Sequence, residues 1–93
     1  MKVVYTPAFQ RSYKKFIKGN TPLQEKINTA LRLLADDPTS PQLKTHKLSG
    51  KLLGLLACSC GYDCRIVFLI EEDNVTEEKN VVLIDFGTHD EVY

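Results

Sequence analysis

The spacing of apolar residues changes once along this chain, and that change most limits the folds it can adopt. Between residues 6 and 37 apolar side chains recur every three to four residues, which is typical of amphipathic helices. From residue 52 onwards they form short runs rich in β-branched residues. Since 93 residues leave room for only one small core, we predict a single α+β domain over residues 1–93. An antiparallel sheet would be packed against an N-terminal helical hairpin.

Start and stop signals place the two helices. Thr6 followed by Pro7 predicts an N-cap and a first helical residue, and the apolar stripe that follows ends near Gly19. Thr21 opens a capping-box pattern that predicts the second helix, and the sequence Asp36-Asp37-Pro38 predicts its end.

The strands are predicted from β-rich runs and turn residues. A first short strand is expected at residues 2–5, before the helices. After a lysine-rich connector at residues 44–51, further strands are expected at 52–59, 63–70 and 81–86, with an acidic loop between the last two. The predicted order is therefore β-α-α-β-β-β.

Charge is balanced in total but divided unevenly along the chain. Residues 1–65 contain eleven Lys and Arg against four acids, whereas residues 66–93 contain one Lys against eight acids. A basic surface of this kind suits a polyanion. For the acidic half, a cationic partner and a simple solvated turn around residues 71–78 both remain open.

The longest apolar run, residues 66–70, is much too short to span a bilayer. The N-terminus has no pattern of an export signal, so we expect a cytoplasmic protein whose three cysteines are free thiols. Cys58, Cys60 and Cys64 provide three sulfurs without the usual four-ligand zinc spacing, so we predict small buried residues rather than a metal site or a nucleophile.

Four polar residues are candidates for chemistry. His46 lies among Lys44, Lys47 and Lys51, where an anionic substrate would be held, and His89 follows a strand that is predicted to be buried. Asp63 and Arg65 are two residues apart on a predicted strand and so share a face. They form either an ordinary surface ion pair or a polar pair at the rim of a cleft.

Three segments resemble the RelE/ParE superfamily of bacterial toxins. They are His46-Lys47-Leu48-Ser49-Gly50 with Gly54, Asp63-Cys64-Arg65-Ile66-Val67-Phe68, and the C-terminal Gly87-Thr88-His89-Asp90-Glu91-Val92-Tyr93. Within the superfamily the sequence is most similar to the YafQ-like branch, because of the H-x-L-x-G segment and the terminal G-T-H-x-x-hydrophobic-aromatic motif. Length and predicted element order agree over the whole chain.

The resemblance implies the toxin of a type II toxin–antitoxin system. Such a toxin is a cytoplasmic endoribonuclease, or mRNA interferase, which binds and cleaves mRNA, usually on the ribosome. It is neutralised in a hetero-oligomer with its cognate antitoxin protein. The resemblance implies no metal or other cofactor, because the ribose 2′-hydroxyl attacks the adjacent phosphate. The protein supplies a base, an acid and cations for the extra phosphate charge.

The resemblance also assigns roles to individual residues. His89 would be the general acid, either His46 or Asp63 the base, and Arg65 the group that stabilises the phosphoryl transition state. Tyr93 would stack on a base or assist proton transfer, and Lys44, Lys47 and Lys51 would follow the RNA backbone.

Three positions depart from the YafQ-like pattern. Ser59, Cys64 and Asp85 stand where that branch has histidine, tryptophan and arginine, respectively. Two alternatives therefore remain: a toxin that acts by binding, like the gyrase inhibitors of the ParE branch, and a catalytically inactive homologue kept for antitoxin binding.

Overall fold

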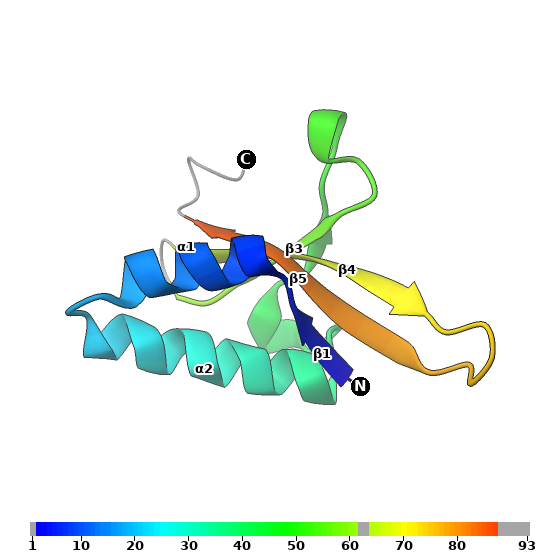
Figure 1. The fold of residues 1–93 in the computed structure, drawn as a ribbon, viewed down its shortest axis with the longest axis horizontal. Helices are drawn as coiled ribbons and strands as arrows, with labels where there is room; N and C mark the ends of the chain where they lie inside the picture. Colours follow the sequence, from blue (N-terminus) through cyan, green and yellow to red (C-terminus); the bar gives the residue numbers. More distant parts are fainter. Residues whose placement is uncertain (1, 62–63, 88–93) are drawn as a thin grey trace.

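The computed structural model describes residues 2–61 and 64–87 of the chain (Figure 1). Two α-helices and a five-stranded sheet confirm the predicted α+β class with a helical hairpin. The elements, in chain order, are β1 (Lys2–Tyr5), α1 (Pro7–Ile17), α2 (Thr21–Asp36), η1 (Pro41–Leu43), β2 (His46–Lys47), η2 (Gly50–Leu52), β3 (Leu56–Ser59), β4 (Arg65–Glu72) and β5 (Lys79–Gly87).

The helix boundaries follow from capping side chains. Thr6 caps α1 as predicted, because its Oγ1 accepts a hydrogen bond from the backbone N–H of Phe9 at 3.2 Å. The prediction that Thr21 caps α2 is wrong by one residue. The cap is Asn20, whose Oδ1 accepts from the N–H of Leu23 at 3.2 Å, and Thr21 is already helical.

The strand order in the sheet is β1-β5-β4-β3-β2. The pairs from β2 to β5 are antiparallel, but β1 runs parallel to β5, so the sheet is mixed and the prediction of a purely antiparallel sheet is wrong. The reason is the chain path: β1 and β5 are connected through the helical hairpin and strands β2 to β4, and a parallel pair requires such a long connection. The Oγ1 of Thr6 anchors this junction by donating to the carbonyl of Leu83 at 2.7 Å.

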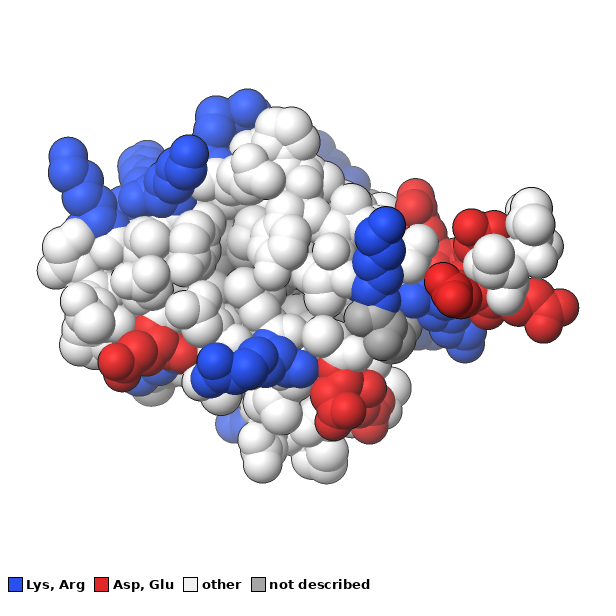
Figure 2. Space-filling model, turned by 60° about the horizontal axis from the view of Figure 1, so that its bottom comes forward, with Lys and Arg blue, Asp and Glu red and all other residues white. Residues whose placement is uncertain are grey.

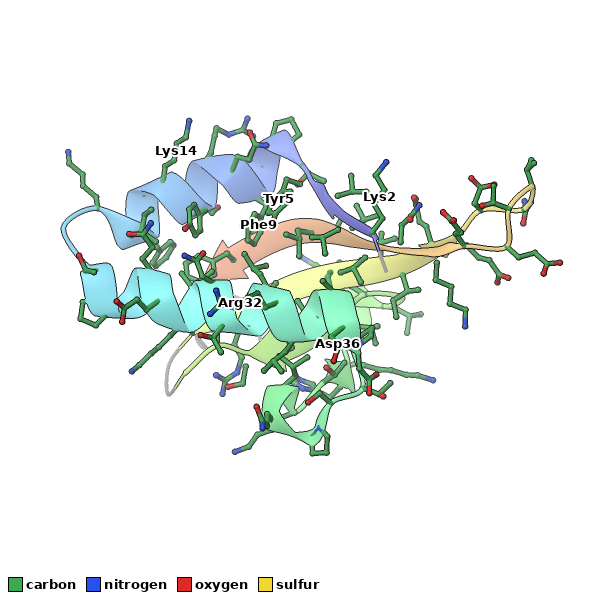
Figure 3. All side chains as sticks on the ribbon, turned by 90° about the horizontal axis from the view of Figure 1, so that it is seen from below. Lys2, Tyr5, Phe9, Lys14, Arg32 and Asp36 are labelled. Atoms are coloured by element: carbon green, nitrogen blue, oxygen red, sulfur yellow. A yellow bond between two sulfur atoms is a disulfide. The ribbon has the colours of Figure 1, made fainter. Side chains whose placement is uncertain are left out.

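The sheet has two differently covered faces. A large core cluster lies between the sheet and the helices and includes Phe9, Ile27, Leu34, Phe68 and Phe86. Phe9 lies beneath the start of α1, in the space between α1 and α2 (Figure 3). On the opposite face a small cluster of Leu48, Ala57 and Val67, joined by Leu52, Leu55 and Ile84, contains no residue of either helix. We call this second side the open face.

Strand boundaries differ from the predictions in the second half of the chain. Within the predicted connector, residues 46–47 form the short strand β2, and residues 52–55 are outside β3. Strand β4 extends to Glu72, and the acidic residues 71–78 are all exposed where β4 and β5 join. Figure 2 shows these acids gathered at one end of the molecule. All residues of this segment are therefore exposed to solvent, as a solvated turn requires.

The prediction that all three cysteines are free thiols is wrong for two of them. Cys60 and Cys64 are joined by a disulfide, with their Cα atoms 5.0 Å apart, while Cys58 is free and buried. The pair closes because β3 and β4 are antiparallel neighbours, and the N–H of Cys60 donates to the carbonyl of Cys64 at 3.0 Å.

Candidate functional site

The structure places His46 and Arg65 on the same face of the sheet. His46 pairs with Ala57, and Ala57 pairs with Val67 on the next strand. Directly paired residues point to the same side, as do residues two apart on one strand, so Arg65 shares this side with Val67. Ala57 and Val67 belong to the open-face cluster. From strand spacing, the Cα atoms of His46 and Arg65 lie roughly 12 Å apart, a span that a bound nucleotide can bridge.

His46 is exposed on the edge strand β2. Its Nδ1 lies 3.2 Å from the carbonyl oxygen of Lys44. A carbonyl can only accept a hydrogen bond, so this contact favours the tautomer with hydrogen on Nδ1 and the lone pair on Nε2. The ring is therefore oriented by the backbone and suited to accept a proton through Nε2.

Arg65 is half-buried at the start of β4 and is oriented by the turn before it. Its Nη1 donates to the carbonyl of Cys64 at 2.9 Å and to the Oγ of Ser59 at 3.4 Å. Ser59 is also its direct partner across the β3–β4 pair. Ser59 in turn donates to the carbonyl of Gly61 at 2.9 Å. The guanidinium is thus positioned by residues of one short loop.

The three candidate lysines do not all lie on one side. Lys44 adopts a left-handed backbone conformation at φ 51°, two residues before the start of β2 at His46. Lys51 stands on the loop whose residues Leu48 and Leu52 pack on the open face. Lys47 pairs with Leu56, which packs against the helical core, so its side chain starts from the opposite face to His46.

Asp85, one of the departures from the YafQ-like pattern, is bound to helix α1. Its Oδ1 accepts hydrogen bonds from the Oγ of Ser12 and from the backbone N–H of Phe86, both at 2.8 Å. In register it lies opposite Val67, next to a bulge in the β4–β5 ladder. The acid therefore has a structural role, tying the last strand to the helical hairpin.

Asp63, His89 and Tyr93 lie outside the residues that the structure describes. Cys64 directly follows residues 62–63, and Gly87 directly precedes residues 88–93. Arg65, the residue after Cys64, is the direct partner of Gly87 in the β4–β5 pair. The roles that the resemblance assigns to Asp63, His89 and Tyr93 remain predictions.

Cys58 is the thiol left outside the disulfide. It is completely buried, and burial raises its pKa to about 12, so it stays protonated near neutral pH. A protonated, buried thiol is a poor nucleophile and a poor metal ligand. Among residues 2–61 and 64–87, no group of three or more His, Cys, Asp or Glu side chains is arranged to hold a metal ion.

A concave region lies on the helical side of the molecule, away from the open face. A groove of about 250 Å³ is lined by apolar and polar side chains of β1, α1 and α2: Tyr5, Phe9, Gln10, Tyr13, Lys14, Asn28 and Leu31. Tyr5 and Phe9 face into this space and Lys14 points outwards from α1 (Figure 3). The described residues that line the groove include no histidine or carboxylate, so it suits binding better than acid–base chemistry. No described helix has the length and apolar character needed to cross a membrane.

A family model described as the bacterial toxin of type II toxin–antitoxin system, YafQ, matches residues 1–93. The chain belongs to this toxin family. The resemblance that was inferred from the His46 and His89 motifs is thereby confirmed. None of the curated proteins compared with the chain matches it.

Solved structures of related toxins have the same fold. The YoeB/ParE toxin from Agrobacterium tumefaciens aligns with a TM-score of 0.77 at 22% identity, covering 96% of this chain and 99% of that one. YafQ from E. coli strain BL21(DE3) aligns with a TM-score of 0.75 at 16% identity, covering 99% and 97%. The YoeB–YefM complex from Staphylococcus aureus aligns with a TM-score of 0.69 at 20% identity, covering 96% and 97%.

Two residues that support the site had no predicted role in it. Ser59 was identified only as a departure from the family pattern, but its hydroxyl contacts Arg65. Ser12 had no signal at all, because its partner Asp85 is 73 residues away in the sequence. Only the register of β3 with β4 and the packing of α1 against β5 bring these pairs together.

Proposed function

We propose that this YafQ-family toxin is a metal-independent endoribonuclease that cleaves mRNA on the ribosome. The observation that carries the proposal is the shared open face of His46 and Arg65, which combines a proton acceptor and a phosphate-binding cation. Family membership supports the same activity. The open face is also the side of the sheet that the helical hairpin leaves uncovered.

In the proposed reaction, the ribose 2′-hydroxyl attacks the adjacent phosphate and expels the 5′-oxygen of the next nucleotide. His46 or Asp63 accepts the proton from the 2′-hydroxyl, and His89 donates a proton to the leaving oxygen. Arg65 offers charged N–H donors to the phosphoryl oxygens, where negative charge grows in the transition state. All heavy atoms that form or break bonds belong to the RNA, so the protein supplies only proton transfer and electrostatic stabilisation.

The deciding experiment compares the unmodified toxin with its His89→Ala variant after induced expression in bacteria. Growth would be followed, and the 5′ ends of mRNA would be mapped. We expect growth arrest with new in-frame cleavage sites for the unmodified toxin, and neither for the variant. Arrest without cleavage would instead identify a toxin that acts by binding. No arrest with either soluble protein would identify an inactive homologue.

The lysines allow a sharper test of the RNA path. Because Lys51 belongs to the loop that packs on the open face and Lys47 starts from the other side, Lys51→Ala should weaken RNA binding more than Lys47→Ala. Removing one phosphate contact should lower the slope of log affinity against log salt by about 0.7 for single-stranded RNA. Titrations of a non-cleavable RNA at several salt concentrations measure this slope. Equal slopes for the two variants would contradict the proposed path.

We further propose that the partner is an antitoxin protein and that it uses the groove between β1, α1 and α2. Among the described residues β1 has a strand neighbour on one side only, so its outer edge can pair with a partner segment. The groove has an apolar floor around Phe9 and Tyr13, with Lys14 at its rim. An acidic, amphipathic segment would complement both features. The aligned YoeB–YefM structure is itself a complex of two proteins.

Tyr5 is the best residue for testing this surface, because it lines the groove and is 48% exposed. Tyr5→Ser should weaken antitoxin binding by about tenfold or more, as expected for an aromatic anchor. Leu53→Ser is the matched control, since Leu53 is 80% exposed on the other side of the sheet. Isothermal titration with the purified antitoxin measures both affinities. An unchanged affinity for Tyr5→Ser would place the antitoxin elsewhere.

A further inference from the structure

The disulfide between Cys60 and Cys64 closes the same short loop that orients Arg65. Cys60 directly follows the end of β3 and Cys64 directly precedes the start of β4, and the two cysteines are also linked by a hydrogen bond from the N–H of Cys60 to the carbonyl of Cys64. The carbonyl of Cys64 accepts a second hydrogen bond, from Nη1 of Arg65 at 2.9 Å. One carbonyl therefore connects the disulfide-closed loop directly to the guanidinium.

Ser59 gives a second connection between the loop and Arg65. Its Oγ accepts from Nη1 of Arg65 at 3.4 Å and donates to the carbonyl of Gly61 at 2.9 Å. Gly61 lies inside the closed loop and has a positive φ of 129°, a conformation that other residues rarely adopt. The acceptors in these two hydrogen bonds of Arg65 therefore belong to Ser59 and Cys64, which lie on either side of the disulfide-linked turn.

The disulfide lies beside a groove on the molecular surface. Cys60 and Cys64 are only 4% and 5% exposed, respectively, but Cys60 lines an open groove of about 520 Å³ together with Ser59, Gly61 and residues of α2. Thiol–disulfide exchange requires the attacking thiolate to reach a sulfur atom. A groove of this size against Cys60 offers such a route.

We propose that Cys60 and Cys64 are a reversible redox modification site that sets the position of Arg65, and that the toxin is more active when they are oxidised. In the oxidation, the two protein thiols exchange with a small-molecule disulfide such as oxidised glutathione. One S–S bond forms in the protein, two electrons pass to the small disulfide, and two small thiols with the two protons leave. Reduction runs the same exchange backwards and removes the covalent link between Cys60 and Cys64.

The test uses the full toxin equilibrated in buffers with different ratios of reduced to oxidised glutathione. Alkylation after denaturation, followed by mass spectrometry, counts thiols: we expect one adduct from oxidised and three from reduced protein. Cleavage of mRNA on ribosomes should be about three- to tenfold faster for the oxidised form, since a loosely held catalytic group lowers the rate. Exchange of the Arg65 side-chain N–H signals, followed by NMR, should be slower in the oxidised form by a similar factor.

Two variants separate this effect from general consequences of redox buffers. The double variant Cys60→Ser with Cys64→Ser should cleave at the rate of the reduced toxin and ignore the glutathione ratio. Cys58→Ser should keep the full redox response, because Cys58 is buried outside the pair. Since the unmodified toxin is compared with itself in two redox states, the result does not depend on either variant folding.

Two outcomes would overturn the inference: three adducts from protein kept in oxidising buffer, or a disulfide that changes neither the cleavage rate nor the Arg65 signals. The inference rests on the proposed ribonuclease activity only for its rate measurement. If the Arg65 signals respond to redox state while no form cleaves RNA, the modification site stands and the ribonuclease proposal fails.

Discussion

Replacing Arg65 by alanine is expected to lower the rate of RNA cleavage by about two to three orders of magnitude, in line with the loss of one preorganised donor at a developing negative charge. The guanidinium is held by Ser59 and by the carbonyl of Cys64. The conformational entropy of the Arg65 side chain is therefore already lost on folding, before the RNA binds. Single-turnover cleavage of a short mRNA bound to ribosomes measures the rate. The effect should appear mainly in the chemical step and less in RNA affinity.

Controls for this variant come from the same chain. Arg65→Lys keeps the charge but loses the planar pair of donors, so it should retain only part of the activity. Arg32→Ala removes an exposed arginine from α2, where its Nη2 donates to Thr29 at 3.3 Å, and should leave cleavage unchanged. Thermal unfolding shows whether Arg65→Ala remains folded. A folded Arg65→Ala toxin with normal cleavage would exclude Arg65 from the reaction.

The helices could be predicted closely because their signals are local. Thr6 with Pro7 and the stop at Asp36–Asp37 act within a few residues, so caps and apolar period fix the boundaries to within one or two positions. The parallel pairing of β1 with β5 could not be predicted, because it depends on contacts about 78 residues apart. The strand β2 was missed because two residues are too few to show a period.

In the candidate site, too, the sequence identifies local features but not long-range contacts. Residue types and motifs identified His46 and Arg65, but their shared face depends on the register of three strands. A shift of one residue in β2 would exchange His46 with Lys47, and the sequence contains nothing that fixes this register. The disulfide also depends on strand pairing. Cys60 and Cys64 are four positions apart in the sequence, and they can pair only if the chain reverses direction between β3 and β4.

His46→Ala carries the second large effect that we expect, a loss of about 10²- to 10⁴-fold in the cleavage rate if His46 is the base. Its ring is oriented through Nδ1 by the carbonyl of Lys44, which leaves Nε2 as the proton-accepting nitrogen. His46 is exposed and contributes little to the core, so the variant should fold as the unmodified toxin does. RNA affinity should change much less than the rate, because a general base acts on the 2′-hydroxyl in the chemical step.

Added imidazole then distinguishes a missing base from a disturbed site. Because the position is exposed, a small base can occupy the space left by His46→Ala and should restore part of the rate in proportion to its concentration. The restored rate should grow as pH rises through the pKa of the added imidazole, since only the neutral ring accepts a proton. A loss below about tenfold, without rescue, would contradict this role and would leave Asp63 as the base. Asp63→Asn is therefore the paired variant: its effect should be the smaller one if His46 takes the proton, and the larger one if it does not.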